Sequence, residues 1–137
     1  MKELIAITVL LILGIIVIAH VYWAFGGKLW LDRVAPKLEG SEADVFTPGM
    51  LATLAVAVVL CLFGLSVMQV MTWVDLSVWF VYGAWATATI FLLRAVGEFK
   101  YVGFFKRVKD SDFAKLDTLF YSPLCLFLSI SIFSLFF

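Results

Sequence analysis

Four long apolar stretches run through this sequence, and they restrict the chain to very few folds. An α-helix needs about 20 mostly apolar residues to cross the hydrocarbon core of a bilayer. The stretches lack the alternation of apolar and polar residues that a transmembrane β-strand requires, which excludes a β-barrel. We therefore predict an all-α integral membrane four-helix bundle that forms one membrane domain over residues 1–137. The expected spans cover about 4–25, 48–71, 76–96 and 119–137.

The composition supports a membrane environment and excludes several classes of protein. Hydrophobic residues make up 64% of the 137 residues and charged residues only 15%, against about 45–50% and about 25% in soluble domains. A chain of this length cannot hide so much apolar surface in its own interior. The formal net charge is zero, so no strong positive field would attract a nucleic acid. A soluble enzyme, a secreted disulfide-rich module and a strongly cationic nucleic-acid binder are therefore excluded.

Basic residues are distributed unevenly between the two ends of the predicted bundle. The segments at and after the ends of the first and third spans hold nine of the ten Lys and Arg residues, and Lys2 is the tenth. In a four-span protein these segments lie on one side, and the positive-inside rule places that side in the cytoplasm. We therefore predict a multi-pass protein of the bacterial inner membrane with both termini outside. The nine basic residues are Lys28, Arg33, Lys37, Arg94, Lys100, Lys106, Arg107, Lys109 and Lys115.

The second and fourth spans begin alike, and the first and third spans end alike. The starts are Thr47-Pro48 and Ser122-Pro123, each preceded by an aromatic residue, and the ends contain Gly26 and Gly97. A Ser or Thr can cap exposed N–H groups at a helix start, and proline suits the first helical position. The pattern indicates either two related helical hairpins or a short chance match, and both interpretations stay open.

Pro123 leaves the start of the fourth span ambiguous. A helix that begins there would hold about 15 residues and reach roughly 22 Å, which is short of the about 30 Å hydrocarbon core. Either the helix starts earlier, with Ser111 as its cap and a kink at Pro123, or it is short and the bilayer thins around it.

Polar side chains of all four spans are expected at the level of the basic loops. Arg94 and Glu98 are four residues apart and would share a helix face, and two helix N-termini at this level favour an anion. One interpretation is a cytoplasm-facing pocket for an anionic or amphiphilic ligand, in which Glu98 orients Arg94 and His20 donates a hydrogen bond or carries a proton. The alternative is an interfacial ion pair with a structural histidine. The candidate ligand-binding residues are His20, Trp23, Thr47, Arg94, Glu98, Tyr121 and Ser122.

The segment after the third span interleaves aromatic and basic residues. Beside a membrane span this pattern is typical of an interfacial segment, with aromatic rings at the headgroup level and bases on anionic lipid. Farther along, Asp110, Asp112 and Asp117 are expected to form a solvated charge run rather than a paired-carboxylate site. The candidate lipid-interface residues are Lys100, Tyr101, Phe104, Phe105, Lys106 and Arg107.

The sequence holds few residues suited to catalysis or metal binding. A single histidine excludes a bis-histidine haem within one chain, and two cysteines without a Cys-x-x-Cys spacing do not support a zinc site. No phosphate-binding glycine loop or catalytic nucleophile motif occurs. We therefore predict no catalytic residues, no metal and no cofactor.

The expected function is that of a non-enzymatic accessory subunit or lipid-interacting protein. The first alternative is binding or transport of an anionic or amphiphilic ligand, and the second is a membrane enzyme that acts on a lipid or a quinone. The expected partners are the lipid bilayer and either a larger membrane complex or a second copy of the chain, without nucleic acid.

Three stretches of the sequence together resemble a known family. They are His20–Gly27, Arg94–Lys106 and Asp117–Leu124. With this length and four spans, the chain resembles, over nearly its whole length, the bacterial small membrane proteins catalogued as domain of unknown function 3995. That family tends to carry Asp at the position of Glu98, where Glu keeps the charge. The resemblance implies a four-helix membrane protein with the polar layer described above, and it implies no activity.

Overall fold

The computed structural model describes residues 1–36, 38 and 48–137, and within these ranges the regular elements are helices. The last three of them follow one another without a break and form one composite helix. The elements are α1 (Lys2–Ala24), α2 (Leu31–Val34), α3 (Met50–Val70), α4 (Val78–Val96), α5 (Asp112–Leu116), the π-helical segment η1 (Asp117–Tyr121) and α6 (Ser122–Ser134).

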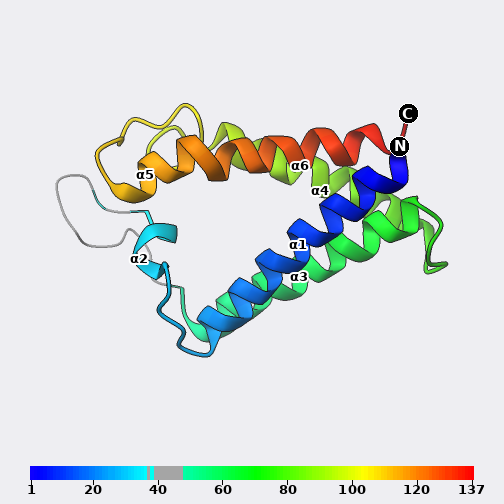
Figure 1. The fold of residues 1–137 in the computed structure, drawn as a ribbon, viewed down its shortest axis with the longest axis horizontal. Coiled ribbons are helices and arrows are strands. Elements are labelled where there is room, and N and C mark those ends of the chain that lie inside the picture. The colour runs from blue at the N-terminus through cyan, green and yellow to red at the C-terminus, as the bar shows by residue number, and fades with distance from the viewer. Residues whose placement is uncertain (37, 39–47) are drawn as a thin grey trace.

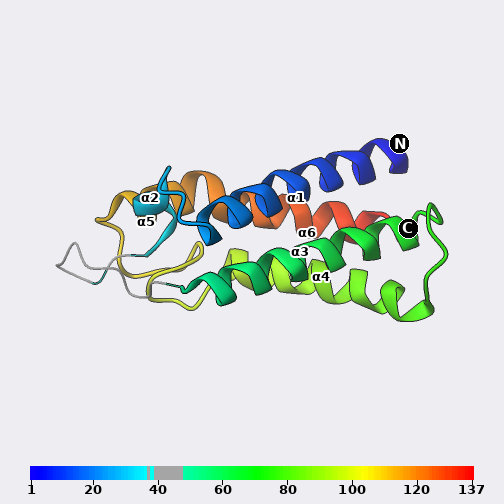
Figure 2. The same ribbon diagram turned by 90° about the horizontal axis from the view of Figure 1, so that it is seen from below.

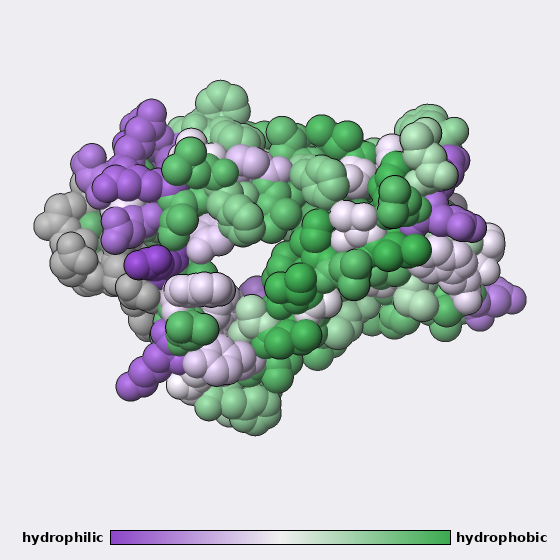
Figure 3. Space-filling model, viewed as in Figure 1, coloured by the Kyte–Doolittle hydropathy of each residue, from purple (hydrophilic) through white to green (hydrophobic). Residues whose placement is uncertain are grey.

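Four helices are long and apolar enough to cross a membrane, namely α1, α3, α4 and the composite helix Asp112–Ser134. Apolar side chains cover the middle of the molecule, and hydrophilic side chains gather at its two ends (Figure 3). The protein is therefore a multi-pass membrane protein with an all-α four-helix architecture, as predicted. The bounds of α1, α3 and α4 follow the predicted spans closely.

The four long helices form two pairs. α1 runs alongside α3, and α4 runs alongside the composite helix (Figures 1 and 2). Both chain termini lie at one end of the molecule together with the turn between α3 and α4. The opposite end carries α2, α5 and residues 97–111, and we call it the polar end. Whether the two pairs arose by duplication stays a prediction.

The core lies where the four helices meet, and much of it consists of small or branched side chains. On α1, Ala6, Val9 and Leu13 are almost fully buried and follow one face of the helix at helical spacing. Small residues on α4 allow the composite helix to approach closely. The core residues are Ala6, Val9, Leu13, Leu60, Val67, Ala84, Ala88, Phe91, Leu128, Ile132 and Leu135.

The fourth helix begins at Asp112, earlier than the expected span at 119. Ser111 caps it, because the Ser111 hydroxyl accepts a hydrogen bond from the Ala114 N–H at 3.1 Å. The composite helix of 23 residues reaches roughly 34 Å, enough to span the hydrocarbon core. The earlier start with Ser111 as the cap is therefore confirmed.

A π-helical turn precedes Pro123 within this helix. The Ser122 N–H donates to the Asp117 carbonyl five residues back, which is the π-helical pattern. Proline has no N–H to donate and crowds the preceding turn of an α-helix. The wider turn accommodates Pro123 inside a continuous helix. The prediction that Ser122 caps a helix start is therefore wrong.

Two glycines allow the loop after α4 to fold back on the helix. Gly97 has φ +83° and ψ −175°, and Gly103 has φ +92°. A Cβ atom at Gly97 would overlap the Val102 carbonyl, and one at Gly103 would overlap the Val96 carbonyl. The Phe104 N–H then donates to the Ala95 carbonyl at 2.9 Å, which ties the loop to the last turn of α4.

Candidate functional site

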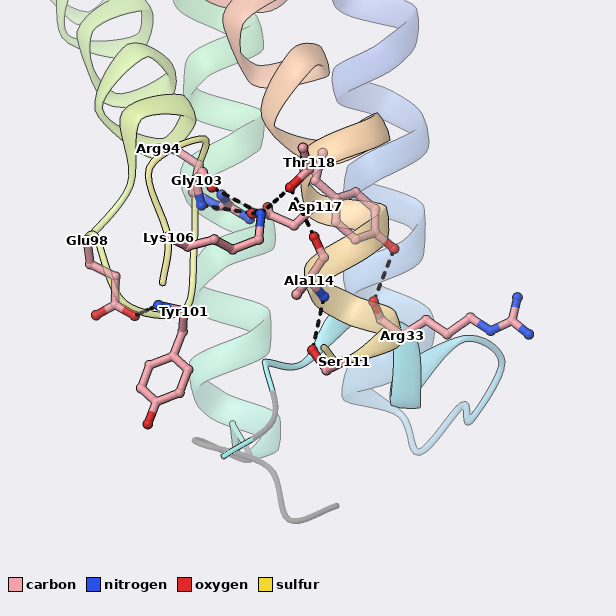
Figure 4. Close-up of polar contacts among 11 residues, drawn as sticks. Arg33, Arg94, Glu98, Tyr101, Gly103, Lys106, Ser111, Ala114, Asp117 and Thr118 are labelled. Atoms are coloured by element: carbon pink, nitrogen blue, oxygen red, sulfur yellow. Dashed lines mark hydrogen bonds and ion pairs between the residues drawn. The ribbon is translucent and has the colours of Figure 1, made fainter. Parts of the chain in front are cut away.

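Asp117 is the centre of a hydrogen-bonded charge cluster at the polar end (Figure 4). Its Oδ1 accepts from Arg94 Nη2 at 2.9 Å. Its Oδ2 accepts from Lys106 Nζ at 3.0 Å and from the Gly103 N–H at 2.8 Å. The cluster therefore joins α4, the loop after it and the first turn of η1. We call Arg94, Gly103, Lys106, Asp117 and Thr118 the Asp117 cluster.

Lys106 uses its whole hydrogen-bonding capacity within the Asp117 cluster. Besides Asp117, its ammonium donates to the Gly103 carbonyl at 3.0 Å and to Thr118 Oγ1 at 2.6 Å. The Thr118 hydroxyl in turn donates to the Ala114 carbonyl at 3.2 Å. The side chains of Lys106 and Asp117 are 1% and 0% exposed, so the charge of Lys106 depends on Asp117 for compensation, whereas Asp117 is also paired with Arg94.

The Asp117 cluster contains two cations and one anion, and its excess positive charge is associated with Arg94. The Arg94 side chain is 34% exposed, whereas that of Lys106 is buried. Its Nη1 atom is buried and has no hydrogen-bond partner among the described residues. The cluster is therefore complete around Asp117 and incomplete at one nitrogen of Arg94.

Two sequence predictions about these residues are wrong. Asp117 does not belong to a solvated charge run, because it lies inside the helix that begins at Asp112 and is fully buried. Lys106 does not lie at the lipid interface, because its side chain turns inward to Asp117. Asp112, by contrast, is exposed, with its Oδ1 4.0 Å from Lys115 Nζ.

The prediction that Glu98 orients Arg94 is also wrong. α4 ends at Val96 and the chain turns at Gly97, so Glu98 no longer continues the helix face of Arg94. The Glu98 carboxylate instead accepts from the Tyr101 N–H at 3.2 Å, within the loop (Figure 4). The partner of Arg94 is Asp117, 23 residues away along the chain.

His20 and Trp23 are engaged near the end of α1. His20 Nδ1 lies 2.8 Å from the Ile16 carbonyl, and because a carbonyl oxygen only accepts, this nitrogen carries the proton. The His20 ring meets the Trp23 ring edge-on at 5.4 Å, and the Trp23 indole N–H donates to the Leu29 carbonyl at 2.9 Å. No hydrogen bond or ion pair within the described ranges joins His20 to Arg94 or Glu98.

The remaining candidate ligand-binding residues have separate positions. The Tyr121 hydroxyl donates to the Arg33 carbonyl at 3.4 Å and so links the composite helix to α2 (Figure 4). Ser122 is fully buried, and its hydroxyl has no partner among the described residues. Thr47 lies outside the described residues. Of the six candidates that the structure describes, His20 and Trp23 contact each other, but these contacts do not bring all six into one site.

Four of the six loop residues expected at the lipid interface are exposed, whereas Tyr101 is half-buried and Lys106 is buried. Phe105 is 65% exposed and meets the 56% exposed Phe99 with ring centroids 6.4 Å apart. Lys100 Nζ lies 4.9 Å from the ring centroid of the half-buried Tyr101. Phe104 and Arg107 are exposed beside them. We call Phe99, Lys100, Tyr101, Phe104, Phe105 and Arg107 the aromatic-basic surface.

Acidic, histidine and cysteine side chains do not gather into a metal site in the part of the chain that the structure describes. Cys61 and Cys125 are both free thiols on different helices. The chemistry of the polar end is therefore that of charge pairing and surface contact.

A comparison with protein families places the chain in one of them. The family model described as protein of unknown function (DUF3995) matches residues 13–132. The chain belongs to this family. The matched region contains the Asp117 cluster and the aromatic-basic surface, and the family description gives no activity. No match to the chain occurs among the curated proteins or the solved structures.

Sequence reasoning missed Asp117, Gly103 and Thr118 as members of one cluster. A usable signal was present, because a helix that starts at Ser111 places Asp117 in its second turn, at the edge of an apolar run. An ionisable residue in such a position needs a partner of opposite charge. Arg94 and Lys106 are basic residues available at the same level.

Proposed function

We propose that this DUF3995 family member is a small non-enzymatic membrane protein whose polar end binds anionic lipid headgroups. The observation that carries the proposal is the aromatic-basic surface, in which Phe99 and Phe105 are exposed beside Lys100 and Arg107. Exposed Phe rings insert at the boundary between headgroups and acyl chains, and bases beside them attract anionic lipid. In a larger membrane complex, the protein would act as an accessory subunit that contributes this lipid contact.

The Asp117 cluster supports the proposal by holding the loop in one shape. Lys106 and Gly103, both bonded to Asp117, flank the exposed Phe104 and Phe105 in the chain. The N–H groups of Arg107 and Val108 also donate to the Lys100 carbonyl, at 3.1 and 2.9 Å. Because the backbone is fixed at these points, the surface would meet the bilayer without first losing loop entropy.

We infer that the polar end faces the cytoplasm in the inner membrane of a bacterium. The support is the excess of Lys and Arg in the two loops of this end, since such loops stay on the cytoplasmic side. Both termini would then lie outside. Cysteines introduced in place of Arg107 or Lys28 should react with a membrane-impermeant maleimide only in opened cells, and reaction in intact cells would reverse the orientation.

The lipid proposal is tested with the double variant Lys100→Gln, Arg107→Gln. Purified protein is reconstituted into nanodiscs that contain phosphatidylglycerol and phosphatidylcholine, and anionic lipid enrichment around the protein is measured by mass spectrometry. Each base contributes about 1 kcal/mol near an anionic surface, or about fivefold in affinity, so the double variant should lose most of the enrichment. The matched control is Lys2→Gln at the opposite end, which should keep it. Equal enrichment in the double variant and the wild type would contradict the proposal.

A second candidate function is the binding of a single anionic group at Arg94. The observation that favours it is the buried and unpartnered Nη1 of Arg94 in a cluster with one excess positive charge. An anion there would satisfy this N–H group and balance the cluster.

The variant Arg94→Lys tests this second function. It keeps a cation beside Asp117 but removes the guanidinium fork. Binding of dihexanoyl phosphatidylglycerol, measured by NMR shifts at Asp117 and Gly103, should be lost while thermal stability changes little. If the lipid causes the same shifts in the variant as in the wild type, binding at Arg94 is rejected.

A further inference from the structure

A groove lies between the first turns of α1 and the last turns of α6, at the end of the molecule opposite the polar end. It has a volume of about 400 Å³, within the about 300–1,000 Å³ of small-ligand sites. The groove is lined by Leu4, Ile5 and Thr8 of α1 and by Phe127, Ile130, Ser131 and Ser134 of α6. It is separate from the aromatic-basic surface, so the two sites can be tested independently.

The groove lies where two membrane helices meet and then separate. α1 and α6 approach each other near the chain termini and diverge toward the polar end (Figure 1). The space-filling view shows an opening between the helices farther toward the polar end (Figure 3), which is separate from the groove. An unfilled space in a folded protein forfeits the dispersion contacts of the atoms that line it. An occupant from the surrounding membrane would restore such contacts to the side chains that line the groove.

The lining selects an apolar occupant. Thr8 Oγ1 donates to the Leu4 carbonyl at 2.8 Å, and Ser134 Oγ donates to the Ser131 carbonyl at 2.7 Å. These two hydroxyl hydrogens are used within their own helices, which leaves the Ser131 hydroxyl as the remaining polar side-chain group of the lining. The other lining side chains of α1, Leu4 and Ile5, are aliphatic, and no charged side chain lines the groove. Water needs two to four polar partners to occupy such a site, so hydrocarbon fits it better.

The volume favours a lipid chain over a helix of a partner protein. A helix about 10 Å in diameter with a 1.5 Å rise displaces roughly 120 Å³ per residue. The 400 Å³ groove would therefore hold only about three residues of a partner helix. A narrow, flexible hydrocarbon chain can instead follow the cleft along the two helices.

We propose that the groove between α1 and α6 binds one acyl chain of a phospholipid. The chain lies along the groove and contacts the α1 and α6 side chains that line it. The groove carries no charge, so the site selects for the hydrocarbon chain rather than for a particular headgroup.

The substitution Thr8→Phe, which fills the groove from the α1 side, tests this site. The matched control is Thr89→Phe on α4, because Thr89 is also a threonine that bonds to the carbonyl four residues back but lies outside the groove. Wild type and variants are reconstituted with a phosphatidylcholine that carries a diazirine in its acyl chain, irradiated and mapped by mass spectrometry. Retained phosphatidylcholine is counted by native mass spectrometry after detergent extraction.

In the wild type, crosslinks should concentrate on Leu4, Thr8, Phe127 and Ile130, and a species with one bound phospholipid should persist. Thr8→Phe should lose both signals, whereas Thr89→Phe should keep them. Ser134→Phe, on the opposite wall, provides a second test if Thr8→Phe does not fold. Crosslinks spread evenly over all membrane-facing surfaces, retained lipid that survives both groove variants, or a protein dimer crosslinked through the groove would each overturn the proposal.

Discussion

The two helix pairs differ in hydropathy and are held together differently at the polar end. The mean hydropathy is 3.0 and 2.6 for α1 and α3, against 1.3 and 1.6 for α4 and the composite helix. The α4–α6 pair is closed by the Asp117 cluster, in which a fully buried carboxylate joins α4, the loop and η1. At the same end of the α1–α3 pair, the polar groups His20 and Trp23 bond to backbone carbonyls close to them in the chain. A buried ionic cluster therefore fixes one pair, while local hydrogen bonds shape the end of α1.

The largest expected effect comes from removing the centre of the cluster. Asp117→Ala would leave Lys106 buried without its counter-charge and Gly103 without its acceptor. Loss of one partner of a buried ion pair costs about 3–5 kcal/mol. Helicity followed during SDS titration in mixed micelles should show this loss, and trypsin should cleave the loop at Lys106 and Arg107. Asp112→Ala, which removes an exposed carboxylate from the same helix, should cost less than about 1 kcal/mol.

The next largest effect compares the glycines that end α1 and α4. Gly97→Ala would force a side chain into a backbone region reserved for glycine and against the Val102 carbonyl, so we expect a loss of at least ~3 kcal/mol. Gly26 also has positive φ, at +89°, but a Cβ there would meet nothing within 4 Å. Gly26→Ala should cost only about 1–2 kcal/mol. Equal losses in thermal unfolding would show that the folded-back loop does not depend on Gly97.

A smaller effect distinguishes the structural lysine from the surface lysine. Lys106→Met should destabilise the protein by about 2 kcal/mol, less than the 3–5 kcal/mol of a fully uncompensated charge, because Arg94 still neutralises Asp117. Lys100→Met should leave stability within about 0.5 kcal/mol but weaken the retention of phosphatidylglycerol. Measuring unfolding and lipid retention on both variants checks the assignment, and identical profiles would refute it.

The smallest effect is expected in the first helix pair. His20→Phe removes a hydrogen bond to Ile16 that lies within α1 itself, so the change in unfolding free energy should stay below about 1 kcal/mol. Equilibrium unfolding followed by circular dichroism measures it. A loss as large as that of Asp117→Ala would mean that the first pair also depends on a buried polar centre.

The fold could be predicted from the sequence because hydropathy acts over whole segments. About 20 apolar residues determine a membrane span almost regardless of their order, so α1, α3 and α4 were predicted closely. The start of the fourth helix needed two local features, the Ser111 cap and Pro123, and these left two alternatives. The helix could tolerate Pro123 without ending because of the π-turn, and the sequence alone does not reveal this turn.

The site was harder to predict because it depends on which residues meet across the loop. Arg94 and Glu98 are four residues apart and looked paired on one helix face. The helix ends before Gly97, however, and Arg94 pairs with Asp117 instead of Glu98. Lys106 looked like its exposed neighbours Lys100 and Arg107, and only the folded loop distinguishes the buried lysine from the exposed basic residues. The exposed aromatic residues were predicted better, since their placement requires no partner.

The π-helical segment η1 has a consequence for how this helix can vary. One additional residue in a turn rotates everything beyond it by about 100° around the axis. The part of the helix at the start of the π-turn and the part after it therefore keep separate angular registers. One register directs Asp117 toward Arg94 and Lys106, and the other packs α6 against α4. Removing a single residue from 117–121 would swing the two registers out of alignment, although every side chain involved in either contact could still be present.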